Sequence, residues 1–293
     1  MAPRSFLRYS ADRRSLFLVA LAALLSLSPF LLAALHPAAW ALVVLWFASL
    51  YARSHAPYAQ HNHAHLSVFR ARPLNAVYDA VLTLVTGYPT ALWELHHNIG
   101  HHQNFLDPEN DVASILDPST GRPVSRLWYM LRGNGMILTD SFRIARQLAA
   151  KDKPKLLRKL RLELALQVIL LALLLVWNAK LATLFFVVPN LFAAALVWWE
   201  SYVHHLGTPG TNVYDGSVTV FGKRFNRANF NIGHHTAHHE KPTLHWSLLP
   251  RRTEQIAGKI PASCMRKDPG PGSFAPAPAA ECYVAHSSAA PTQ

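Results

Sequence analysis

Cysteine is almost absent from this chain. Among 293 residues there are only Cys264 and Cys282, both in the C-terminal part and without CxxC spacing. This scarcity argues against a disulfide scaffold and against a metal site built on thiolates. Charged residues are also few, at 15%, whereas 51% of the residues are hydrophobic. Typical soluble domains carry more charge and fewer apolar groups, so the composition predicts a membrane protein.

The sequence also lacks two kinds of functional motif, one for reading nucleic acid and one for a catalytic serine. The net charge is +12, but the basic residues are not interleaved with any motif that reads nucleic acid, so we expect no nucleic-acid partner. The sequence also lacks a GxSxG nucleophile motif. Many basic residues instead stand next to long apolar runs, where they favour contact with a membrane surface.

The first apolar run follows a basic N-terminus. Arg4, Arg8, Arg13 and Arg14 precede the uncharged segment 15–35. Its 21 residues are about long enough to cross a hydrocarbon core of ~30 Å. A signal peptide would also start with positive charge, but no small-residue cleavage pattern ends this run. We therefore expect a membrane span.

The apolar runs are arranged as two hairpins. After a turn at 36–37 the chain returns through 38–55, and a second pair follows at 162–179 and 181–199. The far turns are nearly uncharged, whereas the near ends are basic or rich in histidine. Because positive charge accumulates on the cytoplasmic side, both termini and the histidines are expected there.

The segments between the hairpins predict surface helices. Residues 73–95 are half apolar and are interpreted as an interfacial or partly sunken helix pair. Residues 118–161 are polar and basic, and 138–154 has the spacing of an amphipathic helix that lies on a membrane. The expected fold class is therefore all-α integral membrane, with four transmembrane helices in two hairpins, interfacial helices and a cytoplasmic histidine-rich cap.

This organisation predicts three parts of the chain. Residues 1–14 form a cytoplasmic N-terminus, 15–250 form the membrane domain, and 251–293 form a C-terminal tail. From residue 268 the tail is rich in Pro, Ala and Ser without apolar periodicity, so we expect it to be disordered.

Histidines gather in three clusters. They are HNHAH at 61–65, HHNIGHH at 96–102 and the stretch 229–250, and a further pair, His204 and His205, follows the fourth apolar run. Residues three or four apart share a face of a helix, so HxxxH and HxxHH each present several imidazoles together. Imidazole suits first-row metals. Because the hairpins bring every cluster to one side of the membrane, one metal centre explains them together.

The candidate ligands outnumber the four positions of one tetrahedral zinc, so two metals are the economical interpretation. Spacing favours His97 over His96 and His235 over His234, while the choice between His204 and His205 stays open. Asp107, Asp111 and Asn231 are candidates to hold the ligands, although a single Asp more often caps a loop. The candidate ligands are His61, His65, His97, His101, His102, His204, His205, His235, His238 and His239.

The order of HxxxH, HxxxHH and HxxHH boxes with two hairpins resembles the membrane fatty acid desaturase and hydroxylase superfamily. The short segments that flank the second and third boxes are also similar to those of the superfamily. They contain Trp93, Asn98, Asn231, Gly233 and Pro242. The resemblance covers roughly residues 15–250. It implies a diiron centre held by box histidines plus one histidine after the fourth helix.

From the resemblance we expect an O2-dependent diiron oxidoreductase with two Fe ions cycling between Fe2+ and Fe3+, which desaturates the chain of a fatty acyl lipid. Hydroxylation, terminal-alkene formation and carotenoid oxidation use similar boxes and stay open. Electrons must come from an external ferredoxin-, rubredoxin- or cytochrome b5-like carrier, because the chain has no His-Pro-Gly-Gly segment and no flavin fingerprint. The expected location is a bacterial inner membrane.

Other classes of protein fit the sequence less well. A zinc-dependent membrane hydrolase would need a nucleophile, and no such motif is present. A metal transporter would place ligands inside the spans, yet Glu163 and Glu200 lie only at helix ends. If the histidines had a purely structural role, all three clusters would have to serve only as hydrogen-bonding groups in a protein core.

Overall fold

The computed structural model describes residues 5–267, and this part of the chain is mostly helical. The expected disordered tail from 268, with Cys282, lies outside the described residues. The chain divides into two units. Unit 1 consists of residues 1–95 and 141–197, and unit 2 consists of 96–140 and 198–293.

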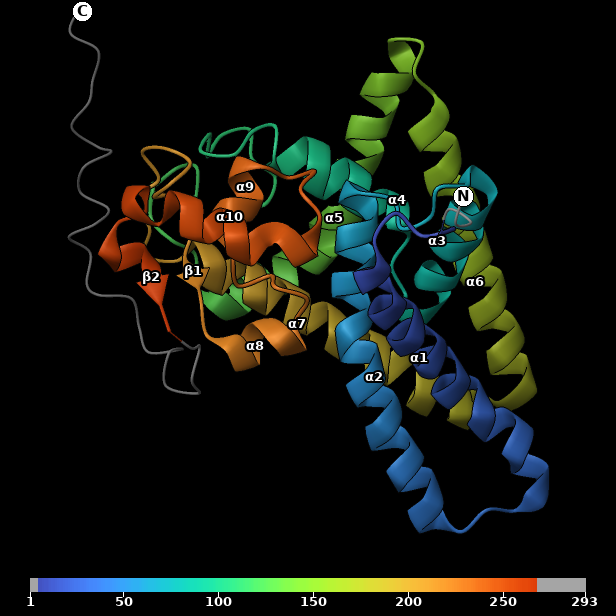
Figure 1. The fold of residues 1–293 in the computed structure, drawn as a ribbon. Coiled ribbons are helices and arrows are strands. Elements are labelled where there is room, and N and C mark those ends of the chain that lie inside the picture. Colours follow the sequence, from blue (N-terminus) through green and yellow to red (C-terminus); the bar gives the residue numbers. More distant parts are fainter. Residues whose placement is uncertain (1–4, 268–293) are drawn as a thin grey trace, which may run out of the picture. The chain divides into compact units, whose positions relative to one another are not determined.

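Unit 1 begins with two long helices that lie side by side and are joined by a short turn (Figure 1). Small residues line their contact, including Ala22 on the first helix and Ala52 and Ala56 on the second, all fully buried. Small side chains let the two backbones approach closely. The elements are η1 (Ser10–Asp12), α1 (Arg13–Leu32), η2 (Ala33–Leu35) and α2 (Ala39–His65).

The second long helical stretch is broken near its middle. α6 (Lys155–Ala182) contains Asn178 with φ −159° and ψ 97°, which are not helical angles. The π-helical turn η4 (Thr183–Val187) follows and leads into α7 (Val188–His205). In η4 the amide of Val188 donates to Thr183, and Pro189 has no amide hydrogen to give. The carbonyl of Leu184 instead accepts from the indole of Trp46 at 2.8 Å.

Two stretches among the described residues are long and apolar enough to cross a membrane. They are Ser10–Leu35 and the 51-residue stretch Lys155–His205. Large apolar side chains on them face outward: Phe17 is 64% exposed and Val176 is 88% exposed. Large exposed apolar patches are rare on soluble monomers and mark contacts with membranes or partners.

Further helical elements connect these long helices to the segments that carry the histidine clusters. They are α3 (Arg72–Thr86), α4 (Thr90–Leu92), the π-helix η3 (Trp93–His101) and α5 (Arg126–Ala150). In unit 1 the ammonium of Lys159 pairs with Asp79 at 2.8 Å, with Glu94, and with Glu163 at 3.7 Å. One member of the basic stretch is therefore turned inward. The exposed members are Arg143, Arg146, Lys151, Lys153, Lys155, Arg158 and Arg161.

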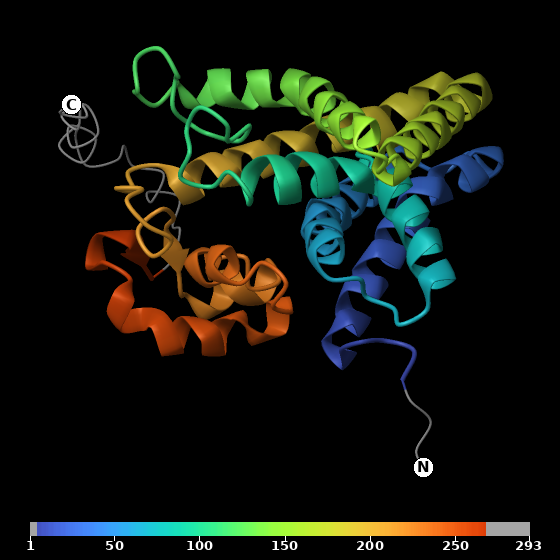
Figure 2. The same cartoon turned by 90° about the horizontal axis from the view of Figure 1, so that it is seen from above.

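The C-terminal part of unit 2 is built from short elements around a small core (Figure 2). Ala237, Leu249, Ile256 and Cys264 are buried there. Two short strands pair in parallel, a minor departure from the all-α expectation. The elements are β1 (Thr219–Val220), α8 (Lys223–Ala228), α9 (His235–Glu240), η5 (Trp246–Leu248), α10 (Leu249–Ile256), η6 (Ala257–Lys259), η7 (Ala262–Cys264) and β2 (Met265–Arg266).

The turn after α3 yields a test of the fold. Gly87 has φ +72°, and a Cβ added to it would lie 2.4 Å from the side chain of Asn190. Gly121 has a similar φ of +64° with nothing within 4 Å of the added Cβ. We predict that Gly87→Ala lowers the free energy of unfolding by about 1–3 kcal/mol more than Gly121→Ala, because only Gly87 adds a clash to the strain. Thermal unfolding in detergent measures both, and equal losses would contradict the contact with Asn190.

Candidate metal centre

The first histidine cluster lies on the last turns of α2, in unit 1. Because α2 continues to His65, the rings of His61 and His65 are neighbours, with centroids 4.7 Å apart. The ring of His61 also lies 5.2 Å from that of Trp93. The expected shared face of the HxxxH box is therefore present.

His63 lies between these two residues in sequence and is held by the protein itself. Its Nδ1 accepts from the amide of Val68 at 3.1 Å, and its Nε2 lies 3.3 Å from a carboxylate oxygen of Asp79. Burial alone would raise the pKa of Asp79, but the hydrogen bond from His63 and the charge of Lys159 together hold it below its usual range. His63 therefore serves packing and hydrogen bonding.

The second cluster owes its geometry to the π-helix η3. The amide of His102 donates to the carbonyl of His97 at 2.9 Å, a bond across five residues. In this wide turn, residues five apart lie one above the other. The Nε2 atoms of His97 and His102 are accordingly 3.1 Å apart. The third cluster adds His238 from α9, whose Nε2 is 3.0 Å from that of His102.

A second group of imidazoles lies beside this one in unit 2. His101, His205 and His239 each offer a ligand atom, and these atoms all lie within 4.8 Å of one another. The Nε2 of His235 is 3.3 Å from that of His205 and 3.2 Å from that of His239. Helix α9 provides His235, His238 and His239, so one short helix contributes to both groups.

The remaining nitrogens of two of these rings are fixed by oxygen atoms. Both carboxylate oxygens of Asp111 accept from Nδ1 of His101 at 2.8 Å. The carbonyl of Gly216 accepts from Nδ1 of His205 at 3.1 Å. A carbonyl oxygen only accepts, so in His205 the hydrogen must be on Nδ1 and the lone pair on Nε2. This arrangement is typical of metal-binding histidines.

The donor set fits a transition metal. Two imidazole nitrogens bound to one ion at about 2.1 Å, with an angle near 90–105°, would lie about 3.0–3.3 Å apart. The Nε2 pairs described above have this spacing. Burial and the nearby imidazoles hold the pKa values of His235 and His239 well below the usual range. These rings are therefore neutral at pH 7, as ligands must be.

In three of the five histidine doublets, the structure brings one member into the groups of facing imidazole nitrogens and gives the second member other contacts. The ring of His96 lies 5.5 Å from Trp198, while His97 joins the first group. His204 stacks on His235 at 4.2 Å, while His205 joins the second group.

The third doublet divides in the same way. The Nδ1 of His234 pairs with the hydroxyl of Thr253 at 2.9 Å, and burial lowers the pKa of His234 to about 4. His235 faces the other histidines.

The other candidates have separate roles. The exposed carboxylate of Asp107 accepts from the amides of Glu109 and Asn110 and so stabilises a turn. The amide of Asn231 donates to the carbonyl of Trp246 at 3.1 Å. Neither contact involves a candidate ligand, so of the three expected supporting residues Asp111 is the one seen against a ligand.

Phe105 and Gly216 were missed at the sequence level. The ring of Phe105 stacks on His239 at 3.9 Å and covers the second group. A Cβ at Gly216 would lie 2.5 Å from the end of the Leu106 side chain and 2.6 Å from the ring of Phe105, so a larger residue there would have to displace both. The position of Phe105, four residues after His101, was a usable signal, whereas the contact of Gly216 depends on folding.

A cavity of about 420 Å³ in unit 2 reaches the second group. His205 and Asp111 line it together with apolar side chains that include Phe105, Leu106 and Ile115. Three further carboxylates, those of Asp107, Glu109 and Asp117, also line it, so the lining is acidic as well as apolar. The cavity provides a path between the second group and the outside of unit 2.

The carboxylate of Asp111 can be tested by substitution. We predict that Asp111→Asn lowers metal affinity by about 10–100-fold, because an amide no longer holds the His101 ring as a carboxylate does. Asp107→Asn is the matched control, since Asp107 stabilises an exposed turn. Competition with a coloured chelator measures both affinities. Equal affinity of the two variants would show that Asp111 does not orient His101.

Comparison with known proteins gives the family. The model of the family described as "Fatty acid desaturase" matches residues 37–270, most of the chain. No curated protein and no solved structure matches. The match covers the three histidine boxes and both groups of imidazoles described above. The chain belongs to the fatty acid desaturase family.

Proposed function

We propose that this protein is an integral membrane oxidoreductase that uses O2 and external electrons to desaturate the hydrocarbon chain of a fatty acyl lipid. Membership of the fatty acid desaturase family supports an oxidoreductase of the desaturase or hydroxylase type. One observation carries the proposal further. Two adjacent groups of imidazoles, with facing nitrogens 3.0–3.3 Å apart, have the composition expected for a pair of iron ions.

The proposed ligands follow the two groups. His97, His102 and His238 would hold one iron, and His101, His205, His235 and His239 would hold the other. We propose that the first box, His61 and His65, completes the set on the pattern of the family. In the remaining doublet, His204 would support the ring of His235 by stacking and would not be a ligand.

When bound, the two irons would supply the oxidising power that removes hydrogen from an unactivated C–H bond with O2 as co-substrate. The chain's own residues have separate tasks. Asp111 and Gly216 orient His101 and His205, so that each presents Nε2. Phe105 covers His239 with an apolar ring and limits the access of water.

The proposed topology has four spans in two hairpins, at about 15–35, 38–55, 162–179 and 181–199. The two apolar stretches and the family suggest a membrane protein. The excess of Arg and Lys at the near ends supports a cytoplasmic location for both termini and the metal centre, in a bacterial inner membrane.

Two alternatives remain within the proposal. Hydroxylation begins with the same abstraction of hydrogen and uses the same ligands, so product analysis separates it from desaturation. A zinc-dependent hydrolase would use a single ion. It is less well supported, because zinc is satisfied by four ligands and the two groups offer more.

Metal content tests the two-ion proposal. We predict about two irons per chain in detergent-purified protein, and about one in each of His238→Ala and His239→Ala, because each variant removes a ligand from a different group. The double variant should hold almost none. His245→Ala is the control, since His245 caps η5 through Ser247. Zinc in place of iron, or no metal in freshly prepared protein, would overturn the proposal.

The electron donor is proposed to dock on the exposed basic residues between α5 and α6. An acidic carrier such as a ferredoxin would be steered there by charge. We predict that turnover with such a carrier falls as ionic strength rises from about 0.05 to 0.5 M, because salt screens exposed charges. Turnover with a small uncharged reductant should stay constant over the same range. Salt-independent turnover with the protein carrier would contradict this docking site.

A further inference from the structure

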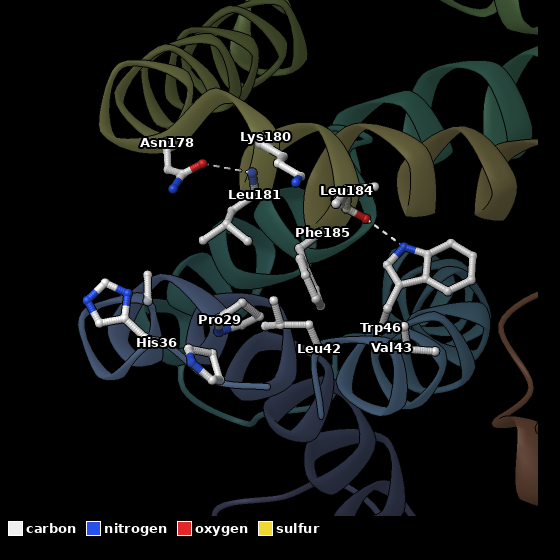
Figure 3. Close-up of a pocket in the computed structure, with 12 residues that line it drawn as sticks. Pro29, His36, Leu42, Val43, Trp46, Asn178, Lys180, Leu181, Leu184 and Phe185 are labelled. Atoms are coloured by element: carbon white, nitrogen blue, oxygen red, sulfur yellow. Dashed lines mark hydrogen bonds between the residues drawn. The ribbon is translucent and has the colours of Figure 1, made fainter. Parts of the chain in front are cut away.

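A second cavity lies in unit 1, and none of the candidate ligands lines it. Its volume is about 440 Å³, within the range of pockets that hold small molecules. It is formed where the turn between α1 and α2 meets the break in α6 (Figure 3). Apolar side chains make most of its walls: Pro29, Leu42, Val43, Leu181, Leu184 and Phe185.

The walls of this cavity are held by hydrogen bonds within the protein. The indole of Trp46 donates to the carbonyl of Leu184, which the π-helical turn η4 leaves without an amide partner. At the break, the side-chain oxygen of Asn178 accepts from the amide of Leu181 at 3.0 Å. Both backbone groups are therefore satisfied without water (Figure 3). An apolar molecule can occupy the cavity without displacing hydrogen-bonded solvent from them.

Two basic side chains, Lys180 and His36, belong to the lining. Lys180 is the one fully charged side chain among the described residues that line the cavity, and it is exposed. His36 is also exposed and is a further nitrogen donor. The same lining contains no carboxylate. An ammonium group beside an apolar cavity favours a ligand with an anionic head and an apolar chain, and lysine is a common partner of phosphate.

The surroundings point to the bilayer as the source of this ligand. The walls come partly from the two stretches that are long and apolar enough to cross a membrane. Apolar residues next to the cavity are exposed, with Leu35 at 73%, Trp40 at 72% and Val43 at 54%. Trp is typical of the membrane interface, where acyl chains meet headgroups. A ligand that enters here approaches from lipid.

We propose that this cavity binds one acyl chain of an anionic phospholipid, with the phosphate paired to Lys180. The site involves neither the metal centre nor the acyl substrate of the proposed reaction. A bound lipid would fill the space between the first and second pairs of long helices and hold them together. It would act as a structural ligand that couples the stability of unit 1 to the composition of the membrane.

Lipid binding to the full chain tests this site. The probes are phosphatidylglycerol and phosphatidylcholine with identical acyl chains, added to delipidated protein in detergent and counted by native mass spectrometry. We expect the parent to retain phosphatidylglycerol more tightly, because the choline cation neutralises the phosphate charge of phosphatidylcholine, and we expect Lys180→Gln to weaken the retention of phosphatidylglycerol by about fivefold and that of phosphatidylcholine by less. Lys155→Gln is the control, because it removes one exposed charge at the other end of the same helix.

A cavity-filling variant tests the apolar part separately. Ala33 lines the cavity, so Ala33→Phe should weaken the retention of both lipids. Thermal unfolding establishes that each variant is folded, and neither measurement depends on iron or on turnover. Equal retention of the two lipids by the parent would overturn the proposal. Retention by Lys180→Gln that matches the parent would overturn it as well.

Discussion

An imidazole ring whose Nδ1 donates to a fixed oxygen keeps the lone pair of its Nε2 for a metal, and two rings of the second group in unit 2 are held in this way. Asp111 and the Gly216 carbonyl hold Nδ1 of His101 and His205. Both partners come from loops, and both loops need special local structure. Asp111 also accepts from the amide of Ala113, and Gly216 packs so close to Leu106 and Phe105 that a side chain there would displace them. The orientation of these candidate ligands therefore depends on the structure of the loops around them.

The π-helix has a related role in both units. In η3 the bond across five residues brings His97 and His102 onto one face, so that a doublet in sequence contributes to two separate groups. In η4 the same type of turn leaves the carbonyl of Leu184 free for Trp46. A π-turn is costly and is found mostly where function requires it. Here one turn positions ligands and the other forms the wall of an apolar cavity.

Unit 1 contains a cluster of largely buried charged side chains around Lys159. Lys159 sits among Asp79, Glu94 and Glu163, and Asp79 also contacts His63. The amide of Ala91, in the segment that leads into η3, donates to Glu163 at 2.8 Å. Each carboxylate thus has a partner, as buried charges require. These contacts join α2, α3 and α6 within unit 1 and secure the beginning of the segment that carries the second box.

The sequence alone determined the helical character, the long apolar stretches and the residues that qualify as ligands. These features depend on local composition and on helical spacing, as His61 and His65 on α2 show. The expectation of four spans follows from the same local patterns and stays a proposal. In three of the doublets, tertiary structure decided which member joins the groups of facing nitrogens, because residues such as His204 and His205 are equivalent by spacing and differ only in what surrounds them. It also decided that Asp111, and not Asp107, holds a histidine, since a carboxylate takes its role from the donors that folding brings to it.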